Sequence, residues 1–256
     1  MDLTTLWFGI VVFFWTGFFV LEGFDFGVGV LARLLGRTDR ERAAYLETIG
    51  PHWDGNEVWL VVAIGAMFAA FPAWYAELLS TSYLPVVLAL VGLIVRGVAL
   101  EWRGKRDDAL WRRRCDLGIA LGSAMVPLVL GAVLVGGATG NFAYAIAGGV
   151  VLLALCLVHG AAFLALRTSG ELRARVPHTS RDALFFAATS VVIAGTIVAL
   201  FVTSFPRAMP GLAYGDAAAS PYALKILTWI GAACVPLVLA YQGWSYWVFR
   251  RRVATS

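Results

Sequence analysis

Acidic side chains interrupt two of the most apolar stretches of this sequence. Glu22 and Asp25 lie three residues apart inside the first stretch, and Asp54 and Glu57 have the same spacing at the start of the second. On a helix, this spacing places each pair on one face. An ionisable group at the centre of a membrane helix costs about 2.5–3.5 kcal/mol, so these groups must be paired, hydrated or covered by protein. They indicate either proton movement or a structural pair with an arginine, for example Arg96.

The second acidic pair lies in the segment 50–60, which reads GPHWDGNEVWL. Asp54 can cap the helix that begins here, and Glu57 three residues later completes a capping-box pattern. Capping alone does not require the whole Trp-Asp-Gly-Asn-Glu-x-Trp cluster. A carboxylate that loads protons at the cytoplasmic mouth of a bundle is therefore the second interpretation. Trp59, just beyond Glu57, can line a small hydrophobic passage or pack in the core or at the membrane interface.

The third apolar stretch contains Arg96 and ends near Glu101. Arg96 is a turn or more from the cytoplasmic edge, so its long side chain can extend to the lipid headgroups. The alternative is a fixed ion pair with a carboxylate of the first stretch. We expect Arg96 and Glu101 to take part in structural ion pairs.

Histidine and cysteine are too scarce for a redox centre. His159 is the one histidine expected within a span, and a bis-histidine haem needs two at matching depth. The three cysteines are far apart and form no CxxC motif, so neither a zinc site nor a disulfide framework is indicated. We expect this chain alone to have no catalytic residue and to bind no cofactor or metal ion.

The composition indicates the elements that position these groups. Of 256 residues, 60% are hydrophobic and 14% are charged, which excludes disorder, a coiled coil and a conventional soluble enzyme. Apolar runs of about 20 residues indicate membrane-spanning helices. We predict an all-α polytopic membrane bundle of about seven helices, at residues 6–32, 56–75, 79–101, 116–136, 143–166, 183–204 and 223–248.

Basic residues predict the orientation. Residues 33–42, 103–114, 167–181 and 250–252 contain four, six, four and three of them, which is 17 of the chain's 20 Lys and Arg. These segments alternate with connections that are almost free of basic residues, as the positive-inside rule requires. We therefore expect the N-terminus outside and the C-terminus in the cytoplasm. The net charge of +4 then indicates contacts with lipid headgroups, and we expect no nucleic-acid partner.

Five segments resemble one protein family. They are 22–29 (EGFDFGVG), 35–42 (LGRTDRER), 50–60, 96–99 (RGVA) and 168–172 (TSGEL). Together they look like subunit II of cytochrome bd quinol oxidase. The resemblance covers most of residues 5–175 and resumes in the C-terminal helix.

The resemblance implies a function for the complex that contains this chain. Quinol is oxidised, oxygen is reduced to water, and protons for water come from the cytoplasm, so the reaction is electrogenic. Haems b and d are held by subunit I, the expected partner in a heterodimer in the bacterial plasma membrane. Subunit II is inactive alone, supports subunit I and contributes to proton and oxygen access. A small accessory subunit and membrane lipids are further expected partners.

The resemblance also implies roles for individual residues. Asp54 is the first candidate for the proton pathway, and Glu57 ranks lower because the family also tolerates a neutral amide there. Asp25 and Arg96 match polar positions on the inner half, and Trp59 is the candidate for an oxygen-access wall. Glu22 remains a pathway candidate from its burial and spacing.

The second half of the chain is short for this family. We divide the chain into a first bundle at 1–175 with the family motifs and a shortened second half at 176–256. The stretch 168–175 resembles the end of the family's fifth helix and is followed almost at once by its penultimate helix. A helix pair is therefore missing. The alternative function is a stand-alone membrane transporter or assembly protein on the same scaffold.

Overall fold

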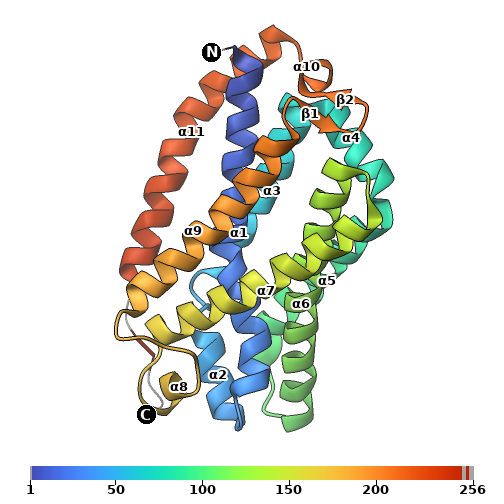
Figure 1. Cartoon of the computed structure of the whole chain (residues 1–256). Coiled ribbons are helices and arrows are strands. Elements are labelled where there is room, and N and C mark those ends of the chain that lie inside the picture. Colours follow the sequence, from blue (N-terminus) through green and yellow to red (C-terminus); the bar gives the residue numbers. More distant parts are fainter. Residues whose placement is uncertain (1, 250–251, 254–256) are drawn as a thin grey trace.

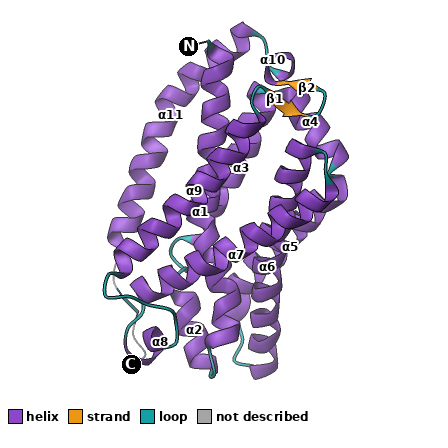
Figure 2. Ribbon diagram, in the orientation of Figure 1, coloured by secondary structure: helices purple, strands orange, loops and turns teal. Residues whose placement is uncertain are grey.

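The computed structural model describes residues 2–249 and 252–253. The described chain is helical apart from a two-stranded antiparallel ribbon, β1–β2, and an isolated bridge between Thr168 and Val253 (Figure 2). The ribbon, in the connection between α9 and α11, was not expected from the sequence. In chain order the elements are α1 (Leu3–Leu35), α2 (Asp39–Glu47), α3 (Trp53–Ala70), α4 (Pro72–Thr81), α5 (Tyr83–Trp102), η1 (Arg103–Lys105), α6 (Ala109–Thr139), α7 (Phe142–Arg167), α8 (Gly170–Ala174), α9 (Asp182–Ser204), β1 (Arg207–Met209), β2 (Leu212–Ala213), α10 (Tyr214–Ala217) and α11 (Pro221–Val248).

Six of the described helices are long and apolar enough to cross a membrane: α1, α5 with η1, α6, α7, α9 and α11. The predicted class, a polytopic helical membrane bundle, is therefore confirmed. The one predicted span without a counterpart among these six is 56–75. It falls on α3 and α4.

The prediction of one continuous helix over 56–75 is wrong. α3 ends at Ala70, Phe71 has φ −137° and ψ 65°, and α4 begins at Pro72. Proline lacks the N–H group that a helix interior needs and disfavours helical geometry in the residue before it. The N–H of Ala219 donates to the carbonyl oxygen of Ala70 at 2.8 Å. The break is thereby tied to the segment that leads into α11.

α1 is the central helix of the bundle. It contacts α3, α6, α7, α9 and α11 along its length, and α2 follows it at one end (Figure 1). Its aromatic side chains Phe18, Phe19 and Phe26 are fully buried. α11 lies at the edge of the bundle, and Leu224 is its one residue buried in the described structure. The acidic residues of α1 are thus in the interior of the protein and not at its lipid-facing surface.

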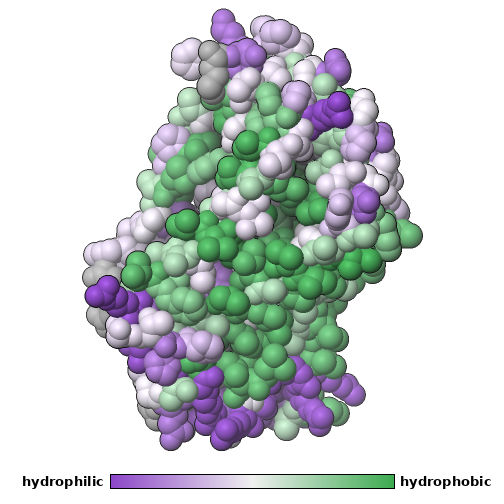
Figure 3. Space-filling view, viewed as in Figure 1, coloured by the Kyte–Doolittle hydropathy of each residue, from purple (hydrophilic) through white to green (hydrophobic). Residues whose placement is uncertain are grey.

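The two ends of the molecule differ in composition. The N-terminus, α4, α10 and the β1–β2 ribbon lie at one end, whereas α2 and α8 lie at the other (Figure 1). Hydrophobic residues form a band between two more hydrophilic ends (Figure 3). The basic segments 33–42, 103–114 and 167–181 all connect helices at the α2–α8 end. Arg250 and Arg251 lie outside the described residues.

Many basic residues of that end pair with acids. Asp116 accepts from Arg42 at 2.9 Å and from Arg103 at 2.6 Å. Glu41 at the start of α2 accepts from Arg175 after α8 at 2.5 Å, and this hydrogen bond lowers the pKa of the Glu41 carboxyl group to about 2. The basic loops therefore connect elements that are distant in sequence.

A glycine contact brings α1 and α7 together. A Cβ atom on Gly27 would lie 2.7 Å from the Cα atom of Gly160 and would also overlap the carbonyl oxygen of Cys156. A Cβ atom on Gly160 would lie 2.5 Å from the Cα atom of Gly27. Small residues at such crossings allow backbones to approach closely in membrane bundles.

We predict that Gly27→Ala destabilises the protein by about 1–3 kcal/mol or more, because the added methyl group meets backbone that cannot move aside. Gly9→Ala is the matched control, since a Cβ atom at Gly9 has no other atom within 4 Å. The measurement is the thermal unfolding midpoint of the purified complex. Equal midpoints for the two variants would contradict the close α1–α7 contact.

Candidate functional site

A buried ion pair lies where α1, α3 and α5 meet. The Nη1 atom of Arg96 contacts Oε1 of Glu22, and both side chains are fully buried. The same nitrogen is 3.7 Å from Oε2 of Glu57. The guanidinium also lies over the ring of Phe26, 4.9 Å from its centroid. Arg96 therefore pairs with a carboxylate of α1 and does not extend to the membrane surface.

Glu101 forms an ion pair at the surface of the protein, apart from the pair of Arg96. Its side chain is 60% exposed, and it pairs with Lys105 one turn later, at 3.2 Å. Glu101 lies at the end of α5 and Lys105 in η1, which follows it. Exposed pairs of this kind contribute little to stability.

Asp25 is held by a residue that the sequence did not single out. The side chain of Asn56 donates from Nδ2 to Oδ2 of Asp25 at 2.7 Å. Gln242 and Tyr246 of α11 donate to Oδ1 of Asn56 at 2.8 and 2.9 Å. The sequence signal was the position of Asn56 between the two acids of α3. Its partners on α11 were not predictable, because they are 186 and 190 residues away.

The cluster contains more acids than bases. Glu22, Asp25 and Glu57 surround the single guanidinium of Arg96. Full ionisation would bury surplus negative charge, and burial of unpaired charge is costly. Carboxyl groups that share a site share protons for this reason. The chemistry that this arrangement supports is the holding and release of a proton.

Asp54 is exposed at the beginning of α3. The expected capping role is not seen, because the N-cap position is His52 and no side chain caps the helix. Glu57, which the capping box required, faces Arg96 instead. Asp54 lies one turn before Glu57, where it also interacts favourably with the helix dipole. It is thus the outermost acid of a series that leads inward.

Trp59 is buried between α1 and α3. Its ring lies 5.7 Å from the ring of Phe13 and 5.8 Å from that of Phe14. A Cβ atom on Gly17 would overlap the indole, so this glycine makes room for it. Trp59 also lines an apolar groove of about 500 Å³ between α3 and α11, together with Val58.

The two histidines near the cluster are packed inside the bundle. The ring nitrogens of His159 contact Thr189 Oγ1 at 2.7 Å and the carbonyl oxygen of Val20 at 3.0 Å. His52 stacks on the ring of Tyr246 with 4.4 Å between centroids. Within residues 2–249 and 252–253, no group of three or more His, Cys, Asp or Glu side chains could hold a metal ion.

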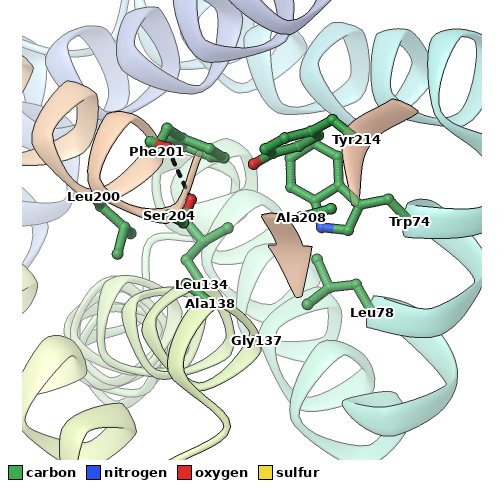
Figure 4. Close-up of a pocket in the computed structure, with 10 residues that line it drawn as sticks. All are labelled: Trp74, Leu78, Leu134, Gly137, Ala138, Leu200, Phe201, Ser204, Ala208 and Tyr214. Carbon is green, nitrogen blue, oxygen red and sulfur yellow. Dashed lines mark hydrogen bonds between the residues drawn. The ribbon is translucent and has the colours of Figure 1, made fainter. Parts of the chain in front are cut away.

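A second cavity lies at the opposite end of the bundle, between α4, α6, α9 and the ribbon (Figure 4). Tyr214 packs against Trp74 there, and the hydroxyl of Ser204 donates to the carbonyl oxygen of Phe201 at 2.8 Å. Its lining contains no acid and no histidine. The candidate site is therefore the cluster around Arg96.

Comparison with known proteins identifies the family. The family model described as cytochrome bd terminal oxidase subunit II matches residues 3–186 and 176–249. The chain belongs to this family. Cytochrome bd ubiquinol oxidase subunit 2 of Bacillus subtilis (strain 168) is 34% identical, over 99% of this chain and 97% of the relative. Cytochrome bd-I ubiquinol oxidase subunit 2 of Escherichia coli (strain K12) is 28% identical, over 98% and 95%. A probable cytochrome oxidase subunit 2 of Haemophilus influenzae is 35% identical, over 75% and 56%. Family membership and the six apolar helices together make this a multi-pass protein of the bacterial inner membrane.

The alignments also show that this family member is short. The alignment with the Bacillus subtilis relative extends over 329 positions, whereas this chain has 256 residues. At least 73 of those positions therefore have no counterpart here. The two matches to the family model meet at residues 176–186, between α8 and the start of α9.

We predict that Arg96→Met destabilises the protein by about 3–5 kcal/mol, because it leaves buried carboxylates without a cation. Adding Glu22→Gln to this variant should restore much of the loss, since it removes an uncompensated charge. Lys105→Met, which breaks the exposed pair with Glu101, should cost at most about 1 kcal/mol. Unfolding of the purified complex in detergent measures all three. Equal losses for the single and double variants would contradict the pairing.

Proposed function

We propose that this chain is subunit II of a cytochrome bd-type oxidase that couples quinol oxidation to reduction of oxygen to water. It is inactive alone and supports a haem-bearing subunit I, which holds haems b and d, and quinol is the substrate of the complex. A small accessory subunit and lipids complete the assembly. The names of the relatives support this role. The observation that carries the mechanistic part is the cluster of three carboxyl groups around Arg96, two of them fully buried.

Protons enter this subunit from the cytoplasmic end of α3 and are held by the cluster. Burial increases along the series: Asp54 is exposed, Glu57 is 28% exposed, and Glu22 is fully buried. Asp54 and Glu57 are about one helical turn apart on α3. Glu57 and Glu22 are linked because both contact Arg96. The positive charge of Arg96 lowers the free-energy cost of a buried carboxylate. The carboxyl groups can therefore release a proton and take up another. The cluster lies in the half of the bundle that carries the basic loops, which agrees with uptake from the cytoplasm.

Oxygen reaches the complex through the apolar region beside Trp59. Molecular oxygen is small and apolar, and the groove that Trp59 lines is apolar as well. The indole fills the space that Gly17 leaves open. It therefore acts as a wall that limits access between the groove and the interior.

The topology in the membrane has seven crossings, with the N-terminus outside and the C-terminus in the cytoplasm. α3 is the seventh span, because its 18 residues rise about 27 Å, close to the hydrocarbon thickness of about 30 Å. When α3 is counted as a span, two spans separate each basic segment from the next, so all the basic segments lie on one side of the membrane. The positions missing between α8 and α9 correspond to a helix pair, which leaves this parity unchanged.

We predict that Asp54→Asn slows both oxygen uptake with a soluble quinol and proton uptake in liposomes by roughly tenfold or more, the lower range of general acid–base effects. The asparagine keeps size and polarity but cannot carry a proton. Glu47→Gln is the matched control, an exposed acid at the same end of the bundle. Wild-type rates for Asp54→Asn in a normally assembled complex would remove Asp54 from the pathway.

We predict that Trp59→Ala changes the rate at which oxygen rebinds the haems after flash photolysis, because it opens the wall beside the groove. Val61→Ala is the control, since Val61 lies on the exposed face of the same helix. Rebinding kinetics identical in wild type and Trp59→Ala would contradict the access role.

A further inference from the structure

The amide of Asn56 uses all of its hydrogen-bonding capacity. Nδ2 donates to Oδ2 of Asp25 at 2.7 Å and to the carbonyl oxygen of Leu21 at 3.1 Å. Oδ1 accepts from Nε2 of Gln242 at 2.8 Å and from the hydroxyl of Tyr246 at 2.9 Å. A primary amide has two donor hydrogens and two acceptor lone pairs, so no capacity remains.

These partners fix the direction of the amide. If the Asn56 side chain were flipped, its oxygen would face the carboxylate of Asp25 and the carbonyl of Leu21, which only accept hydrogen bonds. On the other side, Gln242 and Tyr246 of α11 donate to the amide oxygen and hold it in the observed direction. Because Asn56 is fully buried, water does not replace the bonds that a flip would break.

α11 holds this position mainly through polar contacts. Apolar grooves of about 500 and 750 Å³ separate it from α1 and α3 along much of its length. Leu224, far from Asn56, is its one buried residue in the described chain. Gln242 and Tyr246 therefore reach inward from a loosely packed helix to one amide of α3.

The direction of the amide determines which oxygen of Asp25 is available. Oδ2 accepts from Asn56, whereas Oδ1 is buried and has no hydrogen-bond partner in the described residues. The other groups that act on Asp25 are Glu22 on its own helix, Glu57 on α3 and Arg96 on α5, together with Tyr246 on α11. A proton on Oδ2 would oppose the amide hydrogen.

We propose that Asn56, oriented by Gln242 and Tyr246, is a positioning residue that occupies Oδ2 of Asp25 and so directs proton binding to Oδ1. The proton is bound and released as such, without any change in heavy-atom bonding. Oδ1 is then the oxygen that exchanges a proton with the Glu22–Arg96 pair. This role rests on the proposed function, because it concerns the acids assigned there to proton uptake. It gives the C-terminal helix a part in the site.

Infrared difference spectroscopy of the intact complex tests this role. The carboxyl C=O band of Asp25 is the band that disappears in Asp25→Asn. In Asn56→Leu it should shift to higher frequency, since the carbonyl oxygen loses the amide donor. Proton uptake should slow by about tenfold, the effect expected from one lost hydrogen bond to a charged group. The double variant Gln242→Leu/Tyr246→Phe should shift the same band while Asn56 is retained.

Thr228→Val is the matched control. Thr228 accepts a hydrogen bond from Trp7 at 3.0 Å, so this variant loosens α11 at a point remote from Asp25. The Asp25 band should keep its wild-type frequency. An unshifted band in Asn56→Leu, an equal shift in Thr228→Val, or no band that depends on Asp25 would each overturn the positioning role. Wild-type proton uptake in Asp25→Asn would instead contradict a proton role for Asp25, and the band shift would still report positioning.

Discussion

Burial of the Arg96 guanidinium is the constraint on which the inner half of the molecule depends. A cation inside an apolar bundle requires a carboxylate at contact distance, so α5 must meet α1 at Glu22 and α3 at Glu57. The backbone accommodates this meeting through small residues. A Cβ atom on Gly122 of α6 would lie 2.9 Å from the Cβ atom of Arg96. The charge is thus enclosed by four helices, together with the acids that compensate it.

A different principle holds the C-terminal helix. Among the described residues, α11 lacks the apolar packing of the other long helices, and hydrogen bonds attach it near each end and between the ends. Trp7 donates to the carbonyl oxygen of Leu224 at 3.2 Å near one end. The contacts to Asn56 follow toward the other end, and beyond them Arg167 donates to the carbonyl oxygen of Phe249. Hydrogen bonds in a water-poor interior are strong enough to serve this purpose.

The features that could be predicted from the sequence are those that depend on residues close together in the chain. Apolar runs and the alternation of basic loops indicated the bundle class, and the buried acids of α1 stood out from their surroundings. The break at Phe71 was missed, although Pro72 was visible, because the apolar pattern continues across it. The partner of Arg96 was left open, since spacing gives a helix face but not which helix covers it. The role of Asn56 was missed because it depends on a hydrogen bond from Gln242, which is 186 residues away.

The attachment points of α11 have a mechanical consequence. A rod fixed at points bends between them, whereas a rod fixed along a packed surface does not. Pro236 lies between the attachments at Leu224 and Asn56 and removes one backbone hydrogen bond from the rod. It also lines the larger groove. Bending of α11 at Pro236 would therefore change the width of that groove and leave the spacing of the helices that enclose Arg96 unchanged.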